Sequence, residues 1–299
     1  MEQCYNRLSQ SLNENAIAVE KALVEYLGGE DKDYGVILEA QRYSLLGGGK
    51  RIRPFIVNQC CAMLGGDSER SMPLACAVEM IHTYSLIHDD LPCMDNDDMR
   101  RGKPSNHKKF GYANALLAGD ALLTNAFRVI GEAKALDGDT RAVATATLAV
   151  AAGDRGMIGG QVIDLEGEQT RLDFDKLLRL HAHKTGALIR ASAQLGCLAA
   201  GYGTDSPEST CLTEYAEKIG LAFQVVDDIL DAVSTEEQLG KPVGSDADSN
   251  KTTFLTYYTV DEARRYAQRL TEEAVTAISR MDGSELLTDL ACYLLDRES

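Results

Sequence analysis

Acidic side chains gather at two places that lie far apart in the chain. The first is DDLPCMDNDD at residues 89–98 and the second is DDILD at residues 227–231. Like charges repel and isolated carboxylates are costly to desolvate, so a fold that keeps both clusters needs counter-cations to join them. Sites that contain only oxygen ligands, completed by water and substrate phosphates, suit Mg2+ better than zinc, which prefers His and Cys. The clusters therefore predict a metal and diphosphate enzyme.

The second cluster follows the apolar run IGLAFQVV, which has the composition of a buried helix. Asp227 and Asp231 are four residues apart, so both carboxylates lie on one helix face, with Gln224 one turn earlier on the same side. Asp228 points elsewhere. An acidic turn facing solvent is the alternative for this motif alone, but acidic groups on a largely buried helix need a function.

The first cluster contains a proline. Pro92 should end or bend the helix that carries Asp89 and Asp90, and the following segment then brings Asp95 round. Asp89 and Asp95 could clamp one or two metal ions. Two arginines follow at 100–101, so carboxylates that hold metal and guanidinium groups that bind phosphate oxygens lie in one stretch. Taken alone, this stretch could also be a loop of mutually neutralising charges.

The chain as a whole is acidic, with a formal net charge of −16. This charge argues against nucleic-acid binding, which depends on a basic surface. It also makes the local basic islands informative: GGGKRIRP at 47–54, RRGK at 100–103 and HKK at 107–109. We expect them to hold a small anion, and solvated surface loops are the alternative for any one of them.

Helices must position these groups. Segments with apolar residues three and four apart alternate with short breaks such as GGEDKDYG, GGDSERSMP and GYGTDSP, while strand signals are weak. Thr259 with Glu262, and Thr235 with Gln238, form capping boxes at helix starts. No repeat or change of composition marks a boundary. We therefore predict one all-α domain over residues 1–299, with about ten or more helices.

Composition limits the remaining possibilities. The 299 residues, 44% of them hydrophobic, can bury a substantial core. No stretch reaches the roughly 18 apolar residues needed to cross a bilayer. The start, MEQCYNRLSQ, lacks the basic and apolar regions of a secretory signal, so we expect a cytoplasmic protein. The eight cysteines contain no CxxC pair, which indicates reduced thiols rather than disulfides or a zinc site.

Seven motifs, in the same order, resemble those of the trans-isoprenyl diphosphate synthases, and in particular the short-chain bacterial farnesyl diphosphate synthases. The resemblance runs from about Tyr34 to near the C-terminus. Its motifs are GGGKRIRP (47–54), HTYSLIHDDLPCMDNDDMRRGKPSNH (82–107), LAGDALL (117–123), GMIGGQVIDL (156–165), HKTGALI (183–189), GLAFQVVDDILD (220–231) and LGKPVGSD with NKTTF (239–254). The family implies a helical bundle of the isoprenoid synthase type with a central apolar cavity, and a homodimer.

The resemblance also implies roles for individual residues. Isopentenyl diphosphate would be bound by Lys50, Arg53, His82 and Arg101. The allylic substrate, dimethylallyl or geranyl diphosphate, would be bound by Arg100, Lys184, Lys251 and Lys241. About three Mg2+ ions per active site would be held by Asp89, Asp90, Asp95, Asp227 and Asp231. Further contacts would come from Gln161, Thr185, Gln224 and Asp228. Within these sets the residues closest to the chemistry would be Asp89, Asp95, Arg100, Lys184, Asp227 and Lys251.

The implied reaction is a head-to-tail condensation. Metal and cationic side chains neutralise the departing diphosphate and leave an allylic carbocation, which a dry apolar cavity protects from water. The double bond of isopentenyl diphosphate attacks this cation, and loss of a proton gives an allylic diphosphate five carbons longer. No side chain is an obvious base, and the resemblance suggests that the released diphosphate takes the proton.

Product length depends on the helix that leads to Asp89. Tyr84 and Ser85 lie about one turn before Asp89 and Ile81 about two turns before it, so a growing hydrocarbon meets them in sequence. One turn advances about 5.4 Å, close to the reach of an isoprene unit. The bulk of Tyr84 favours a C15 product, farnesyl diphosphate, although ordinary core packing would also explain a tyrosine here.

Three other functions stay open. A geranylgeranyl diphosphate synthase would make C20 with the same motifs. A class I terpene cyclase shares the metal-binding aspartates but need not hold a second diphosphate, and the basic islands argue against it. A non-catalytic prenyltransferase subunit is disfavoured by the intact DDILD motif. The short tail CYLLDRES is less basic than in many relatives, so we expect no role for it in closing the site.

Overall fold

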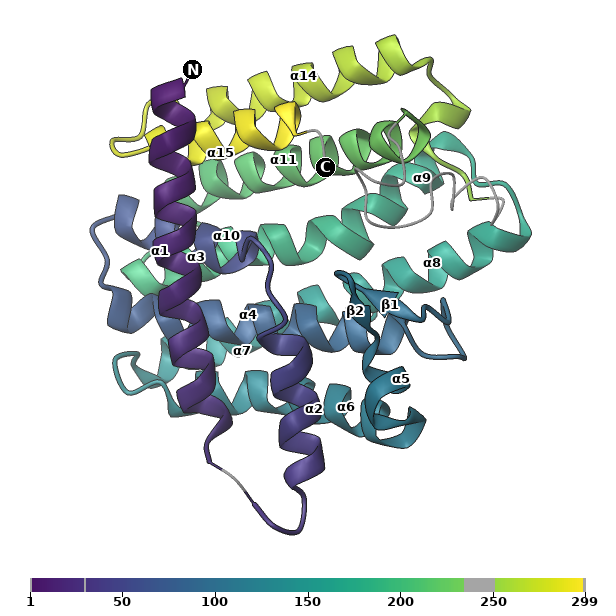
Figure 1. Ribbon diagram of the computed structural model, residues 1–299. Coiled ribbons are helices and arrows are strands. Elements are labelled where there is room, and N and C mark those ends of the chain that lie inside the picture. The colour runs from purple at the N-terminus through teal and green to yellow at the C-terminus, as the bar shows by residue number, and fades with distance from the viewer. Residues whose placement is uncertain (1, 30, 234–250, 298–299) are drawn as a thin grey trace.

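The structure is a computed structural model that describes residues 2–29, 31–233 and 251–297. Most helices lie side by side in a stack, and α1 and α2 cross the front of it (Figure 1). The α-helices are α1 (Glu2–Leu27), α2 (Gly35–Leu45), α3 (Ile52–Met63), α4 (Ser68–Asp89), α5 (Asn106–Phe110), α6 (Tyr112–Glu132), α7 (Gly138–Ala152), α8 (Met157–Gln169), α9 (Phe174–His181), α10 (Ala187–Ala200), α11 (Pro207–Val233), α14 (Val260–Ile278) and α15 (Glu285–Asp296). The described ranges also contain the π-helical turn η1 (Ala182–Gly186) and the 3-10 turn η2 (Phe254–Thr256). The predicted all-α fold is confirmed.

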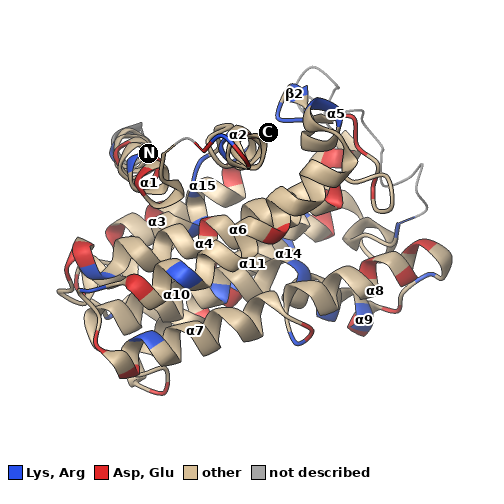
Figure 2. Ribbon diagram, turned by 90° about the horizontal axis from the view of Figure 1, so that it is seen from below, with Lys and Arg blue, Asp and Glu red and all other residues tan. Residues whose placement is uncertain are grey.

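A small hairpin interrupts the helices. Its strands β1 (Met99–Arg100) and β2 (Lys103–Pro104) pair antiparallel and are the only strands in the described ranges. Arg101 and Gly102 form the turn with φ angles of 53° and 71°, a region that suits glycine and is strained for arginine. Basic and acidic segments lie together around β2 and α5 (Figure 2). The sequence did not predict this hairpin because two-residue strands leave no alternating pattern.

Helix α4 delivers the first acidic cluster from the middle of the stack (Figure 1). Residues 74–81 are all buried, and a helix that is apolar on nearly every side must have neighbours all round. Asp67 caps its start by accepting a hydrogen bond from the Glu69 backbone N–H at 2.7 Å. The helix ends at Asp89, as Pro92 predicts. A rigid, buried element therefore places Asp89 at its carboxyl end.

Apolar side chains form three clusters, and α11 connects two of them. The largest lies mainly between α4, α6, α7 and α10 and includes Tyr84. The second joins α3, α10, α15 and the first half of α11, which supplies Tyr215. The third packs α9, α14 and the second half of α11 around Phe254. The packing of α11 in both clusters fixes the position of Asp227 near its end.

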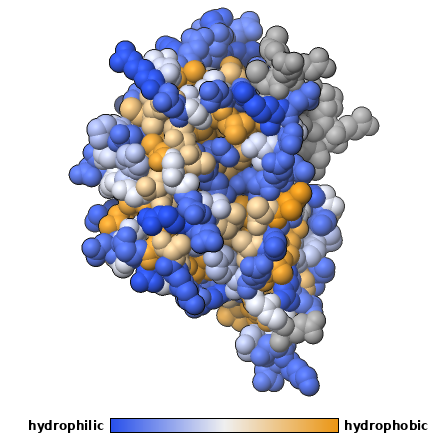
Figure 3. Space-filling model, turned by 90° about the vertical axis from the view of Figure 1, so that its left-hand side faces the viewer, coloured by the Kyte–Doolittle hydropathy of each residue, from blue (hydrophilic) through white to orange (hydrophobic). Residues whose placement is uncertain are grey.

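The surface is mixed in polarity. On the side drawn in Figure 3, apolar side chains are scattered among hydrophilic ones. Large apolar residues are exposed on α6, α7 and α8: Tyr112, Leu116, Leu117, Val143, Val150, Ile158 and Val162. Among the described residues, no helix has the length and apolar character needed to span a membrane.

Candidate active site

The carboxylates of the first acidic cluster are held close together. The backbone N–H of Asp95 donates to the Asp89 carbonyl oxygen at 2.9 Å, so the turn after α4 folds back on the helix end. Burial raises the pKa of Asp89 to about 6; the charge of Lys184 opposes this rise and that of Asp95 adds to it. A carboxylate this hard to ionise without a cation is suited to bind one.

Asp90 faces a different partner. Its side chain is buried and accepts hydrogen bonds from the Arg100 guanidinium, one of them at 2.9 Å from Nε. Arg100 also lies 3.2 Å from Asp97. Hydrogen bonds to a carboxylate fix the planar guanidinium in orientation. Asp90 therefore anchors Arg100 at the base of the hairpin.

In the second acidic cluster, Asp227 lies on the same face of α11 as Gln224, as predicted. Gln224 Nε2 donates to Asp227 Oδ2 at 3.1 Å, which shows that these two side chains share a side. Asp228 points elsewhere, because its carboxylate accepts the Phe254 backbone N–H at 2.7 Å and fixes the start of η2. Asp231 is buried, whereas the Asp227 side chain is 44% exposed. Of the three aspartates, Asp227 is the most accessible to a ligand.

The C-terminal tail contacts this second cluster. Arg297 donates a hydrogen bond to Asp227 and another to the Phe223 carbonyl oxygen at 3.2 Å. Its side chain is only 10% exposed, and its guanidinium lies over the Phe223 ring. The tail therefore contributes Arg297 to this group of residues, and the sequence predicted only that the tail does not close the site.

Asp164 on α8, outside both acidic clusters, lies close to two lysines. The Lys184 ammonium lies 2.5 Å and the Lys251 ammonium 3.7 Å from its Oδ2 atom. Lys251 is also 3.7 Å from Glu168. Burial alone would raise the pKa of Asp164, but the positive charges of Lys184 and Lys251 outweigh this effect and lower the pKa. Asp164 is not among the predicted site residues, although it lies three residues after Gln161 on α8, at the spacing of one helix face.

The close approach of α8 to η1 depends on a glycine. A Cβ atom on Gly160 would lie 2.2 Å from the Lys184 backbone nitrogen, so no other residue fits without displacing η1. Lys184 and Thr185 both lie in this π-helical turn, and such turns are frequent at functional sites. The absence of a side chain at Gly160 therefore lets η1 lie close enough to α8 for Lys184 to contact Asp164.

The basic groups predicted for isopentenyl diphosphate line one hollow of about 230 Å3. Its lining includes Lys50, Arg53, His82 and Arg101, together with Phe223 and Arg297. Burial, with Arg53 nearby, holds the pKa of His82 well below its usual range, so His82 is neutral near pH 7 and offers hydrogen bonds rather than charge. The other cationic groups make the hollow suitable for an anion.

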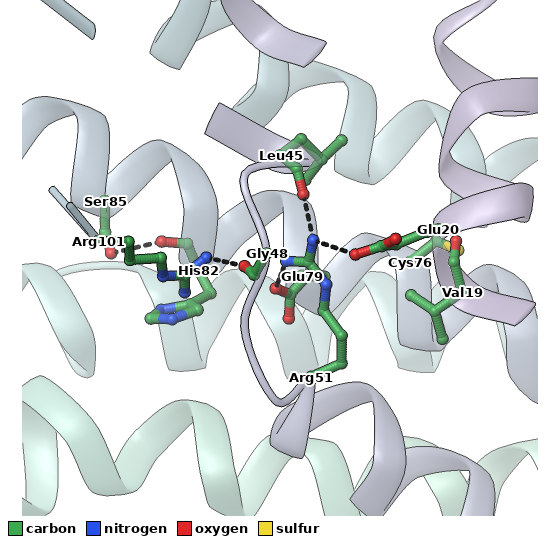
Figure 4. A network of polar contacts seen from close by, with 10 residues as sticks. All are labelled: Val19, Glu20, Leu45, Gly48, Arg51, Cys76, Glu79, His82, Ser85 and Arg101. Carbon is green, nitrogen blue, oxygen red and sulfur yellow. Dashed lines mark hydrogen bonds and ion pairs between the residues drawn. The ribbon is translucent and has the colours of Figure 1, made fainter. Parts of the chain in front are cut away.

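A buried ion pair between Arg51 and Glu79 lines part of this hollow, and Figure 4 shows its contacts. Arg51 is fully buried and contacts Glu79 at 2.6 Å, Glu20 at 2.9 Å and the Leu45 carbonyl oxygen at 2.6 Å. Arg51 and Glu79 line the hollow together with Lys50 and Arg53, but the charge of Arg51 is already paired with carboxylates. These basic residues cannot be told apart from the sequence, because the carboxylates that pair with Arg51 come from distant helices.

Arg101 is held by the glycine-rich loop. Its guanidinium donates to the Gly48 carbonyl oxygen (Figure 4). A Cβ atom on Gly49 would lie about 3.0 Å from the same guanidinium. The loop GGGK at 47–50 therefore approaches the hairpin through its backbone, and this contact places Arg101 in the hollow.

Of the three residues predicted to limit product length, Ile81 and Tyr84 are buried and Ser85 is partly buried. Ile81 is fully buried and Tyr84 is 5% exposed. Ser85 donates to the His82 carbonyl oxygen at 2.9 Å. Burial, with the nearby charge of Asp89, raises the pKa of Tyr84 to about 12, so its phenol stays neutral.

The acidic residues fit magnesium. Within the described ranges, no three His, Cys, Asp or Glu side chains are grouped so that they could hold a metal ion by themselves. Mg2+ rarely needs such a group, because it binds one or two carboxylates and completes its shell with water and substrate phosphates. The crowded Asp89 and the accessible Asp227 supply such carboxylates. Lys241, predicted to bind the allylic substrate, lies outside the described residues.

Comparison with known proteins agrees with this geometry. The polyprenyl synthetase family profile matches residues 35–285. A farnesyl diphosphate synthase from Geobacillus stearothermophilus is 49% identical over 252 residues, which cover 83% of each chain. The large subunit 1 of a chloroplastic heterodimeric geranylgeranyl pyrophosphate synthase from Arabidopsis thaliana is 46% identical over 271 residues, 88% of this chain and 72% of the relative. The structure of a Zymomonas mobilis FPP/GFPP synthase superposes with a TM-score of 0.86 at 37% identity, covering 97% of this chain and 99% of the other.

The helical fold and its paired acidic and basic groups define a prenyltransferase that acts on isoprenyl diphosphates. The chain belongs to the polyprenyl synthetase family. It is a trans-prenyl synthase, and the resemblance found in the sequence is confirmed.

Proposed function

We propose that this chain condenses isopentenyl diphosphate with dimethylallyl and geranyl diphosphate to give farnesyl diphosphate. The observation that carries the C15 product is the buried Tyr84 ring, which stands about one helical turn before Asp89 on α4. A ring of this size leaves room for a C10 primer to gain one unit and closes the path beyond it.

Each diphosphate has its own binding groups. The basic hollow takes isopentenyl diphosphate through Lys50, Arg53 and Arg101, with neutral His82 as a hydrogen-bonding partner. Lys184 and Lys251 bind the allylic diphosphate from the Asp164 side. Arg100, held by Asp90, binds it from the hairpin. The allylic group is thereby oriented toward the double bond that attacks it.

Magnesium completes this set. Asp89, Asp95 and Asp227 are the ligands that we propose for it, with Asp231, Gln224, Thr185 and Gln161 as supporting contacts. Bound Mg2+ would neutralise the diphosphate as the allylic C–O bond breaks. The lysines that neutralise the leaving group remain beside it after cleavage, so they keep the released diphosphate in place to accept the proton. We also propose that an apolar cavity lies along α4, as predicted from the sequence, and that it would keep water away from the allylic cation.

The assembly and the domain organisation are also proposals. The exposed apolar residues of α6, α7 and α8 supply a surface for a homodimer. A single domain and a cytoplasmic location stay predictions of the sequence.

A geranylgeranyl diphosphate synthase is the second candidate. The relatives include a synthase of this name as well as a farnesyl diphosphate synthase. The deciding experiment incubates the purified chain with Mg2+, labelled isopentenyl diphosphate and each allylic primer, and sizes the products by mass spectrometry. C15 should accumulate and EDTA should abolish turnover. Accumulation of C20 would establish the second candidate, and cyclised hydrocarbon without consumption of isopentenyl diphosphate would establish a terpene cyclase.

A further inference from the structure

Tyr84 is packed against an aromatic neighbour on its own helix. The imidazole of His88, one turn later on α4, meets the Tyr84 ring edge to face, with centroids 5.6 Å apart and an interplanar angle of 78°. The phenol oxygen of Tyr84 is buried and has no hydrogen-bond partner in the described part of the chain. Among the described residues, packing against neighbours rather than a hydrogen bond therefore holds this ring in position.

His88 is in turn held by α6. Its Nε2 atom lies 3.0 Å from the Leu116 carbonyl oxygen and 3.9 Å from the Asp120 carboxylate. A carbonyl oxygen only accepts hydrogen bonds, so Nε2 is the nitrogen that carries the proton and donates. The imidazole therefore has one preferred orientation between the two helices.

A glycine on α6 makes room for this imidazole. A Cβ atom on Gly119 would lie 2.1 Å from His88 Nε2 and 2.4 Å from Cδ2. Glycine weakens a helix interior relative to alanine, so it needs a local reason. Gly131, in the same helix, provides the contrast, because a Cβ atom there would meet nothing within 4 Å. Gly119 therefore forms a slot, and His88 fills it.

We propose that His88, seated in the slot at Gly119, is a positioning residue that sets product length by fixing the Tyr84 ring. His88 acts through Tyr84 and need not touch the substrate. This inference rests on the proposed function, in which Tyr84 limits the hydrocarbon to C15. Removal of the imidazole leaves a void beside Tyr84, the ring swings into it, and the path for the growing chain opens.

The first test compares products from geranyl diphosphate. His88→Ala should raise the ratio of C20 to C15 about fivefold, which corresponds to a difference of about 1 kcal/mol between the two barriers. KM for isopentenyl diphosphate should stay at the wild-type value, since the basic hollow is untouched. Tyr84→Ala is the positive control, and Tyr84→Ala/His88→Ala should add nothing to its effect, because the two residues act as one unit.

The outcomes separate this inference from the proposed function. A wild-type product ratio in His88→Ala, alongside longer products from Tyr84→Ala, would overturn the positioning role and leave the floor intact. The positioning role would also be overturned if the double variant changed the ratio of C20 to C15 by the combined effects of the two single variants. Unchanged C15 from Tyr84→Ala would show that Tyr84 is not the floor, and the role of His88 in product length would fall with it.

Gly119→Ala and Gly131→Ala form a matched pair that reaches the same slot from α6. Gly119→Ala should lower the melting temperature and change the product ratio, whereas Gly131→Ala should do neither. Adding His88→Ala to Gly119→Ala should restore stability, because the new methyl group then occupies the vacated space. If Gly119→Ala behaved like Gly131→Ala, the slot would have no function. If Gly119→Ala does not fold, the test is whether adding His88→Ala restores folding. Restored folding would support the slot, and continued failure to fold would contradict it.

Discussion

Arg297 donates a hydrogen bond to the carboxylate of Asp227 while its guanidinium lies over the Phe223 ring, 3.9 Å from the centroid. The same arginine lines the basic hollow. Arg297 therefore binds the carboxylate of Asp227, which we propose as a metal ligand, while it lines the hollow that we propose for isopentenyl diphosphate. We therefore expect Arg297 to compete with metal for Asp227, and a diphosphate in the hollow to draw the arginine away.

The first prediction follows from this competition. Arg297→Gln should lower the Mg2+ concentration for half-maximal activity roughly threefold to fivefold, the equivalent of about 1 kcal/mol for a partly exposed ion pair. Mn2+ binding to the substrate-free protein, followed by electron paramagnetic resonance, should tighten by a similar factor. Arg280→Gln, at an exposed position after α14, is the control. Weaker Mn2+ binding in Arg297→Gln would contradict the competition.

The second prediction concerns Gly160. Gly160→Ala forces α8 away from η1, because the new methyl group meets the Lys184 backbone. KM for geranyl diphosphate should rise at least about tenfold, the equivalent of about 1.4 kcal/mol, while KM for isopentenyl diphosphate should change little. Steady-state kinetics with each substrate varied in turn measures both values. Equal losses for the two substrates would show that the substitution damages the fold in general.

The third prediction concerns pH and Asp89. The folded protein holds the pKa of Asp89 at about 6, above its ordinary value of about 3.8, so between these values the folded state binds more protons than the unfolded state. Stability of the metal-free protein should therefore fall as pH rises from about 4 to 6, by roughly 2 kcal/mol from this group. Urea unfolding in EDTA measures it. Asp89→Asn should flatten this part of the profile, and an unchanged slope would refute the assignment.

The fourth prediction concerns the buried ion pair. Glu79→Gln leaves the Arg51 guanidinium buried with one charged partner fewer, and it should lower the free energy of unfolding by about 3 kcal/mol. Glu273→Gln removes a surface partner of Lys218 and should change it by less than about 1 kcal/mol. Denaturant unfolding of both variants provides the comparison. Similar losses in the two would mean that the Arg51 contact has no special weight.

Local signals in the sequence predicted local structure well. Pro92 marks the end of α4 at Asp89. The predicted capping box is present at Thr259, which accepts from the Glu262 backbone N–H at 3.3 Å and donates its own to the Glu262 carboxylate at 2.9 Å. The other predicted box, at 235–238, lies outside the described residues. Each confirmed feature depends on neighbours within one or two turns, which the sequence displays directly.

Features that depend on distant residues were missed. Asp164 meets Lys251 across 87 positions, and Arg297 meets Asp227 across 70. In the sequence Arg51 looks like its basic neighbours, and only the fold brings Glu20 of α1 and Glu79 of α4 into contact with it. Such contacts follow from helix packing, and no periodicity in one segment encodes them.

A crystal structure with Mn2+ and inorganic diphosphate, with the metals located by anomalous scattering, would decide whether the two acidic clusters share metal. We expect metal ions that bridge one diphosphate to Asp89 on α4 and to Asp227 on α11, with Arg297 released from Asp227. Diphosphate bound in the basic hollow alone, with no metal between the two acidic clusters, would contradict this expectation.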